Sequence, residues 1–177
     1  MEWLTDPELN GGGALMDFGC YGANLITWLR DGEKPKRVTA VTAQLQPENN
    51  PQVEDEAIIL LEYDTAVGVI QASWNWPIGR KDMEVYGTEG AVYADNRHDL
   101  RIRIPTGYDT FTEKVLNLPE LKSPFDDPFA YLRAVVQNKI TPGPYDPSSL
   151  ENNLIVMEIL DAARRSAATG RAVEIRD

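Results

Sequence analysis

Asp17, Tyr21 and Asn24 are the residues whose types and spacing best suit chemistry in this sequence. They follow one another by four and then three positions, which places side chains on one face of an α-helix, and Trp28 continues the series. A carboxylate, a phenol and an amide on successive turns can form one hydrogen-bonding row, held more firmly than groups on a loop. The same spacing also describes the ordinary solvated face of an amphipathic helix, so spacing alone leaves both interpretations open.

The helix that must position these residues is predicted over 14–30. Glycines at positions 11–13 precede it, and Asp31-Gly32 supplies a stop signal at its C-terminal end. A second series with 3,4,3,4 spacing predicts the stripe that the helix buries: Leu15, Phe18, Gly22, Leu25 and Leu29.

Composition restricts the function classes. The 177 residues suit one domain, and 17 basic against 28 acidic residues give a net charge of −11, which repels a nucleic-acid backbone. The single cysteine, Cys20, excludes an internal disulfide and indicates a reducing compartment; it is either a reactive thiol or a small buried helix residue. No apolar run reaches the length of a membrane span, and the acidic N-terminus is unlike a signal peptide, so we expect a soluble, cytoplasmic protein that does not contact membranes.

The middle of the chain has the alternating, β-branched character of strands separated by turn residues. Strands are predicted at 37–45, 54–63, 67–74, 83–86, 91–94, 100–104 and 111–118. Asp64-Thr65 and the segment 87–90 are tight turns, which predict two hairpins.

The last third returns to helices. Asp126 or Asp127, followed by Pro128, predicts a helix start that runs to about residue 138. Ser148 and Glu151 match a capping box before a long helix that ends at Gly170, and 172–175 suits a closing strand. The long helix is expected to turn these residues inward: Leu150, Leu154, Met157, Leu160 (or Ile159) and Ala163.

This order of elements predicts an α+β fold with an open, mainly antiparallel sheet and helices packed on one face. Strands such as 57–61 are apolar on both sides, so something must cover the other face. A second copy of the same sheet is the simplest candidate, which predicts a homodimer or higher homo-oligomer.

The sequence lacks the motifs or residues that several common kinds of site require. No glycine-rich nucleotide-binding fingerprint follows a strand, and no phosphate-binding loop motif is present. His98 is the only histidine, so we expect neither a metal site nor a histidine-paired nucleophile. Trp74, Trp76 and Tyr21 suit either a carbohydrate-stacking surface or ordinary packing.

The stretch GGGALMDFGCYGANLITWL resembles the C-terminal domain of the Gfo/Idh/MocA family, named for glucose-fructose oxidoreductase and inositol dehydrogenase. The family motif, approximately GGG-x-L-x-D-x-G-x-H-x-x-D, is matched at positions 11–13, Leu15, Asp17 and Gly19. The similarity continues in order through 67–74, YGTEG at 86–90, DPF at 127–129 and SAATGRAV at 166–173, and so covers nearly the whole chain. It implies that residues 1–177 are one C-terminal substrate-binding and oligomerisation domain, without the N-terminal Rossmann domain.

The resemblance also implies site roles. The family's usual histidine is Tyr21 here and the following aspartate is Asn24, which is similar to the subgroup containing glucose-fructose oxidoreductase, some xylose dehydrogenases and dihydrodiol dehydrogenases. Asp17 and Tyr21 would be catalytic, with Asp17 positioning the substrate and Tyr21 passing a proton, and Asn24 would be a substrate ligand. A phenol with a reference pKa of about 10 needs a nearby cation for this near neutrality.

In the family that cation is a lysine of an E-K-P motif in the Rossmann domain. Glu33-Lys34-Pro35 spells the motif, but it lies after the helix instead of before the domain, so we interpret it as coincidental. Trp76 and Arg80, in the irregular segment after a strand, are further substrate-binding candidates, because such loops often supply specificity.

The resemblance therefore implies an oxidoreductase that uses NAD or NADP, with no metal, on a sugar, polyol or related hydroxy or carbonyl compound. The cofactor-binding residues would lie mainly in the Rossmann domain, so we expect the isolated chain to be inactive. The alternative is a non-catalytic scaffold whose sheet mediates assembly; a Rossmann fingerprint encoded directly upstream of Met1 would distinguish the two.

Overall fold

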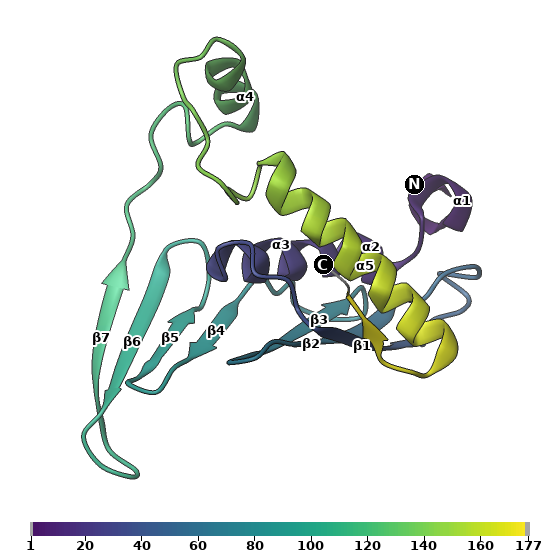
Figure 1. Ribbon diagram of the computed structural model, residues 1–177, viewed down its shortest axis with the longest axis horizontal. Helices are drawn as coiled ribbons and strands as arrows, with labels where there is room; N and C mark the ends of the chain where they lie inside the picture. Colours follow the sequence, from purple (N-terminus) through teal and green to yellow (C-terminus); the bar gives the residue numbers. More distant parts are fainter. Residues whose placement is uncertain (1, 176–177) are drawn as a thin grey trace. The chain divides into compact units, whose positions relative to one another are not determined.

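The computed structural model describes residues 2–175 and divides into two compact units, shown in Figure 1. Unit 1 comprises residues 2–76 and 142–175, and unit 2 comprises residues 77–141. Helices and antiparallel strands occur in both units, which confirms the predicted α+β class.

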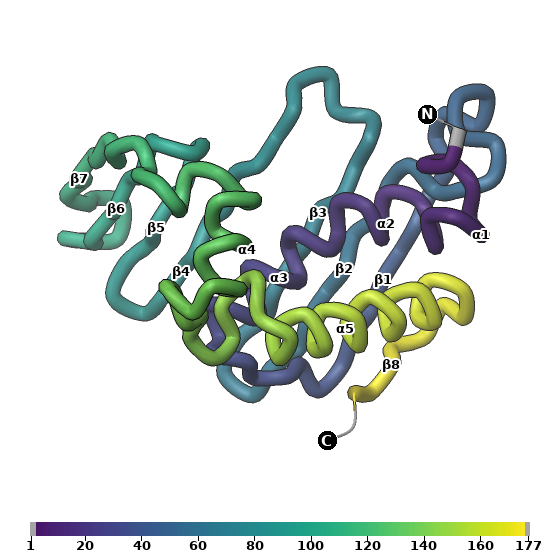
Figure 2. Tube along the Cα trace, turned by 90° about the horizontal axis from the view of Figure 1, so that it is seen from above, coloured from purple at the N-terminus to yellow at the C-terminus, as the bar shows by residue number. Residues whose placement is uncertain are grey.

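Unit 1 is a helical layer on a four-stranded antiparallel sheet with the order β3-β2-β1-β8. Its strands are β1 (Arg37–Ala43), β2 (Glu56–Glu62), β3 (Val67–Ser73) and β8 (Val173–Glu174). Its helices are the 3-10 turn η1 (Glu2–Thr5), α1 (Pro7–Asn10), α2 (Ala14–Asp17), α3 (Gly19–Leu29) and α5 (Leu150–Thr169). Figures 1 and 2 show α3 and α5 side by side on the same face of this sheet.

The two faces of this sheet differ because side chains alternate along each strand. On β2, Ala57, Ile59 and Leu61 are fully buried, whereas Ile58 and Leu60 are 43% and 42% exposed. The buried set faces α3 and α5 and forms the core of unit 1. The sheet therefore has helices on one face, as predicted.

Close approach of α3 to the sheet depends on glycine. A Cβ built on Gly22 would lie 2.5 Å from Cγ2 of Ile70 on β3, so no larger residue fits without a shift. Gly22 thus belongs to the packed stripe, as the 3,4 spacing predicts. Leu25 and Leu29, which were predicted to be buried in the same stripe, are 39% and 43% exposed, so the prediction is wrong for these two residues.

The predicted helix over 14–30 is interrupted. Phe18 separates α2 from α3, and the amide of Tyr21 donates to the Phe18 carbonyl across the break. Helix α3 ends at Leu29, just before the left-handed Asp31 and Gly32, so the predicted stop is confirmed.

The long helix α5 is confirmed, with a different start and a different buried face. Ser149, not Ser148, caps it, accepting a hydrogen bond from the amide of Asn152, and the left-handed Gly170 ends it. Its buried apolar residues are Ile155, Val156, Ile159, Leu160, Ala162 and Ala163. Leu150, Leu154 and Met157, which were expected inside, are more than half exposed.

Unit 2 contains a second four-stranded sheet, a meander of neighbouring antiparallel strands followed by one helix. Its elements are β4 (Met83–Tyr86), β5 (Ala91–Ala94), β6 (Asp99–Pro105), β7 (Phe111–Asn117) and α4 (Pro128–Val136). The Tyr93 ring lies beneath the guanidinium carbons of Arg101 and Arg103, which are 4.7 and 4.9 Å from its centre. The expected single sheet is thus two sheets, with the order β3-β2-β1-β8 in unit 1 and β4-β5-β6-β7 in unit 2.

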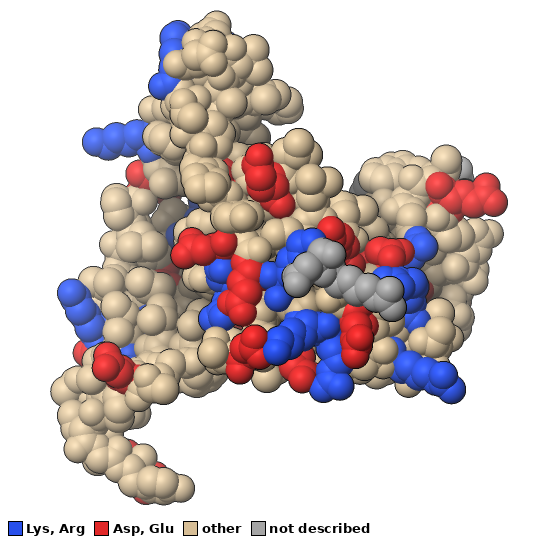
Figure 3. All heavy atoms as spheres, in the orientation of Figure 1, with Lys and Arg blue, Asp and Glu red and all other residues tan. Residues whose placement is uncertain are grey.

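Charged side chains of both signs are intermingled on the face seen in Figure 3. In unit 1, Arg37 pairs with Glu62 across β1 and β2 at 2.7 Å, and Lys34 pairs with Glu158 at 2.8 Å. Such exposed pairs contribute little stability individually. Each basic side chain in them is paired with a carboxylate, which offsets the charge that would otherwise attract an anion.

Candidate functional site

Asp17 ends α2, and its carboxylate is fixed by a tryptophan. Oδ2 of Asp17 accepts a hydrogen bond of 2.9 Å from Nε1 of Trp74, the residue that directly follows β3. The side chain of Asp17 therefore bonds to the residue after β3, and not to the glycine-rich segment at the helix start. Because an indole N–H is only a donor, this bond holds the carboxylate as an acceptor.

Tyr21 lies one turn further along, on α3. Its side chain is 54% exposed, and its ring packs edge-on against Phe18, with centroids 6.1 Å apart. The ring contact restrains the phenol although most of it faces outward. An exposed phenol four positions after a restrained carboxylate is an arrangement that can contact a small polar molecule from outside unit 1.

The side chain of Asn24 is held by residues at the start of α5. Its Nδ2 donates to the carbonyl of Pro147 at 2.8 Å and lies 3.4 Å from Oδ1 of Asn153, so it ties α3 to the start of α5. The side chains of Asp17 and Asn24 thus bond outside the predicted row, to Trp74 and to the α5 segment.

Cys20 sits between the predicted site residues in sequence. Burial raises the pKa of its thiol, and the nearby Asp17 carboxylate raises that pKa further. Its Sγ also donates to the backbone carbonyl of Asp17 at 3.1 Å. These features favour the interpretation of Cys20 as a packed helix residue over that of a reactive thiol.

The other two predicted site residues fall in different units. Trp76 is half-buried at the end of unit 1, two positions after the Trp74 that bonds to Asp17. Arg80 belongs to unit 2, where its guanidinium contacts both carboxylate oxygens of Asp82 at 2.9 and 2.7 Å. The structure thus places Asp17, Tyr21, Asn24 and Trp76 in unit 1 and Arg80 in unit 2.

The start of α2 has a partner that the sequence does not reveal. Oε1 of Glu54 accepts hydrogen bonds from the amides of Gly13 at 3.0 Å and Leu15 at 3.2 Å, and the Glu54 carbonyl accepts from Ala14 at 2.9 Å. Glu54 and Trp74 were missed as site residues because they contact α2 across 41 and 57 positions of sequence. Only the glycines at 11–13 hint at such a close approach.

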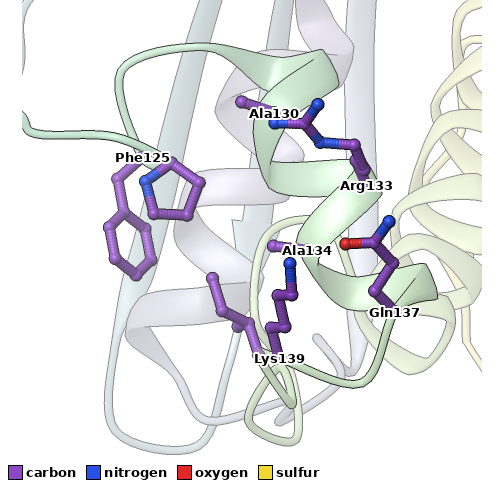
Figure 4. A pocket seen from close by; sticks show the side chains of 8 residues that line it. Phe125, Ala130, Arg133, Ala134, Gln137 and Lys139 are labelled. Carbon is purple, nitrogen blue, oxygen red and sulfur yellow. The ribbon is translucent and has the colours of Figure 1, made fainter.

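Unit 2 has an open hollow of about 350 Å³ beside α4. Figure 4 shows Phe125 on one side of it and Arg133 and Gln137 on the other. None of the predicted site residues lines this hollow.

The described residues bear on two other classes of site. Between residues 2 and 175 no group of three or more His, Cys, Asp or Glu side chains is arranged to hold a metal ion. None of the helices in that range is both long and apolar enough to cross a membrane.

The sequence of this chain is similar to those of known oxidoreductases. Residues 1–93 match the sequence model of the GFO/IDH/MocA C-terminal domain. A trans-1,2-dihydrobenzene-1,2-diol dehydrogenase of Xenopus laevis is 33% identical over 88 residues, which are 50% of this chain and 25% of that protein. A D-xylose 1-dehydrogenase [NADP(+)] of Haloarcula marismortui is 34% identical over 92 residues, 51% of this chain and 25% of the relative.

Solved structures match over nearly the whole chain. GenD2 from gentamicin A biosynthesis, solved in complex with NAD, has a TM-score of 0.71 and 29% identity, covering 100% of this chain and 52% of its own. An aldose-aldose oxidoreductase from Caulobacter crescentus complexed with glycerol has a TM-score of 0.74, covers 98% of this chain and 50% of its own, and at 23% identity shows the shared fold. The chain spans about half the length of each of these structures.

Proposed function

The chain belongs to the Gfo/Idh/MocA family of oxidoreductases, and we propose that it supplies the substrate-binding and oligomerisation domain of an NAD(P)-dependent member. The whole enzyme acts on a CH–OH group, or the corresponding carbonyl, of a sugar, polyol or related compound. The observation that carries this proposal is the Asp17 carboxylate, anchored by Trp74 four positions before the exposed phenol of Tyr21. The sugar and diol dehydrogenases among the relatives support the substrate class.

Asp17 and Tyr21 have complementary roles in this proposal. Oδ2 of Asp17 is occupied by the Trp74 indole, whereas Oδ1 accepts no hydrogen bond from the described residues and can accept one from a substrate hydroxyl. The phenolic oxygen of Tyr21 gives a proton to, or takes one from, the reacting oxygen of the substrate. Such a transfer by a positioned side chain contributes roughly 10²- to 10⁴-fold to a rate.

The remaining substrate contacts are secondary. Oδ1 of Asn24 accepts no hydrogen bond from the part of the chain that the structure describes, so it is the atom of that amide offered to substrate. Trp76 and Arg80, on the segment that follows β3, are proposed as specificity residues.

The dinucleotide supplies the hydride chemistry when bound, and a Rossmann domain outside these 177 residues is proposed to hold it. No residue of this chain is assigned to the dinucleotide. The outward-facing Tyr21 suits such a division, because its phenol is reachable from outside unit 1.

The isolated chain is therefore expected to be inactive. Incubating it with NAD or NADP and a panel of aldoses and polyols should give no change in absorbance at the reduced-nicotinamide band. The matched sample is a protein in which the same chain follows its Rossmann domain, and that protein should turn over at least one substrate. Robust turnover by the 177 residues alone would contradict the proposed division of labour.

The uncovered face of the unit 1 sheet is proposed to bind a second copy of the chain. Its centre is apolar, with Val41, Val67 and Val69 exposed by 68%, 71% and 56% beside Ile58 and Leu60. The cross-strand register places Ile58 opposite Val41, and Leu60 opposite Val69, so these side chains form one continuous patch. A patch of this kind can pair with its own copy about a two-fold axis.

The single cysteine supports a reducing, cytoplasmic setting.

The apolar sheet patch also favours a second candidate function, a non-catalytic scaffold that assembles through this face. The coding sequence upstream of Met1 distinguishes the two: a Rossmann fingerprint there supports the enzyme, and a natural start codon with no partner gene supports the scaffold.

A further inference from the structure

Glu54 lies just before β2, 37 positions after Asp17 in the sequence, yet it contacts the beginning of the helix that carries Asp17. We propose that Glu54 is a positioning residue that sets the place of the Asp17 carboxylate and the Tyr21 phenol. This inference rests on the proposed function of that pair and extends it to a residue outside the family motif quoted above.

The contact satisfies the amides that a helix start leaves without partners. One carboxylate oxygen of Glu54 accepts from Gly13 and Leu15, while the Glu54 carbonyl accepts from Ala14. Helix α2 is only four residues long, so its own backbone bonds hold it weakly. Hydrogen bonds from amides to an ionised carboxylate are stronger than neutral ones, so Glu54 is a main support of this short helix.

The fit around Glu54 is close. A Cβ built on Gly13 would lie 1.8 Å from the carbonyl oxygen of Glu54 and 2.9 Å from its carbonyl carbon. No side chain therefore fits at position 13 beside Glu54, and the first turn of α2 cannot move away without losing three hydrogen bonds. Asp17 closes this same turn, because its amide donates to the Gly13 carbonyl at 3.0 Å.

The next residue, Asp55, is linked to Asp17 through Trp74. The carbonyl of Asp55 accepts from the amide of Trp74 at 2.9 Å, and the indole of Trp74 donates to Asp17. Asp55 is itself fully buried, with hydrogen bonds from Leu45, Gln46, Asn50 and Asn75. The pair Glu54-Asp55 thus holds the backbone that carries Asp17 and the backbone of Trp74, whose indole donates to the Asp17 carboxylate.

Restraint through Glu54 and Trp74 matters for chemistry because reacting groups must be held within a fraction of an ångström. A misplacement of about 1 Å can cost roughly 100-fold in rate. Loss of the Glu54 carboxylate should therefore lower kcat more than it raises KM in the whole enzyme, because it moves the reacting groups without removing a substrate contact.

The first test uses the 177-residue chain and needs no activity. Amide exchange and the Trp74 indole proton resonance are followed by nuclear magnetic resonance in wild type, Glu54→Ala and Glu62→Gln. Glu62 is the matched control, since it lies on β2 in an exposed pair with Arg37. In Glu54→Ala the Gly13 and Leu15 amides should exchange about 10-fold faster. Ala14, whose acceptor is a backbone carbonyl, should change less, and the indole resonance should shift.

A loss of global stability alone would speed amide exchange throughout the chain and leave the indole resonance of the folded chain in place. That result would overturn the proposal.

Two further variants serve if Glu54→Ala does not fold. Glu54→Gln keeps an acceptor oxygen at the same reach, whereas Glu54→Asp withdraws it by one methylene. The proposal expects the exchange and indole changes in Glu54→Asp and much smaller ones in Glu54→Gln; equal behaviour of the two would contradict it.

The second test measures kcat and KM for the same variants in a protein that also contains the Rossmann domain. About a 10-fold or larger fall in kcat for Glu54→Ala, with recovery in Glu54→Gln, is expected. If Tyr21→Phe strongly lowers kcat while Glu54→Ala leaves kcat normal, the positioning role of Glu54 would be overturned. If Tyr21→Phe has no effect either, the proposed function of the pair fails, while the exchange experiment still decides whether Glu54 holds α2.

Discussion

Asp55 shows how a single buried residue supports the site from a distance. Burial by itself raises the pKa of a carboxyl group, but hydrogen bonds from the amides of Leu45 and Gln46 and from the Asn75 side chain outweigh it. The pKa of Asp55 therefore lies below its ordinary value, which means that folding stabilises the ionised form. The charge is needed because four donors converge on this one side chain.

A lowered pKa in the folded state makes stability depend on pH in one direction. The stabilisation from Asp55 is complete above its unfolded pKa of about 3.9 and is lost as the pH falls through the lower folded value. Urea unfolding should therefore show the free energy of unfolding decreasing below about pH 4.

Asp55→Asn should be about 3 kcal/mol less stable at pH 7 and should depend less on pH in that acid range. Asp64→Asn, at an exposed pair with Lys36, is the control and should change the free energy of unfolding little. Equal acid sensitivity in wild type and Asp55→Asn would refute this role.

Spacing in the sequence identified Asp17, Tyr21 and Asn24 as members of one region, and the structure places them on the neighbouring helices α2 and α3. It did not identify their partners. Trp74 and Glu54 reach Asp17 and its helix across long stretches of sequence, and no periodicity reports such contacts. The roles of the three residues stay predictions, since spacing specifies a face and not a reaction.

Among the elements, the start of α2 is closely constrained by Glu54. Because a side chain at Gly13 would collide with the Glu54 carbonyl, Gly13→Ala must displace either α2 or the segment before β2. We expect a loss of about 3 kcal/mol in the free energy of unfolding, measured by urea denaturation. Gly143→Ala, where an added Cβ meets nothing within 4 Å, should be nearly neutral. Similar losses for both variants would show that glycine flexibility, and not the close contact, explains the effect.

The strands were the most predictable elements. The predicted runs 83–86 and 91–94 coincide with β4 and β5, and the other five long strands agree to within two residues at each end. Alternation of side chains and turn residues is local information, so sequence suffices for it.

The buried face of α5 was harder to predict. Leu150, Leu154 and Met157 form one apolar series and Ile155, Val156 and Ile159 form another, and only packing decides which is buried. The division into two sheets was likewise missed, because strand pairing is a property of the whole molecule.

For the whole molecule, the apolar patch on the unit 1 sheet predicts self-association. Sedimentation equilibrium of the wild-type chain should detect a dimer, and Val69→Lys, in the patch opposite Leu60, should shift the population to monomer. Leu9→Lys changes a residue on α1 that is 70% exposed and lies off the patch, so it should leave the dimer intact. A strictly monomeric wild type at high concentration would count against the second-copy proposal.

The central claim is that this domain brings Asp17 and Tyr21 to the substrate of an oxidoreductase. Its most direct test is the turnover of Tyr21→Phe in a protein that joins this chain to its Rossmann domain. Removing only the phenolic oxygen should reduce kcat by roughly 10²-fold or more. The free energy of unfolding should stay within about 0.5 kcal/mol, because the side chain is 54% exposed.

Tyr108→Phe is the control for this measurement, since Tyr108 is fully exposed in the turn between β6 and β7 and should tolerate the same change. A large loss of kcat in Tyr21→Phe, with wild-type kcat in Tyr108→Phe, is the result that the proposed site predicts. Near-normal turnover by Tyr21→Phe would contradict it.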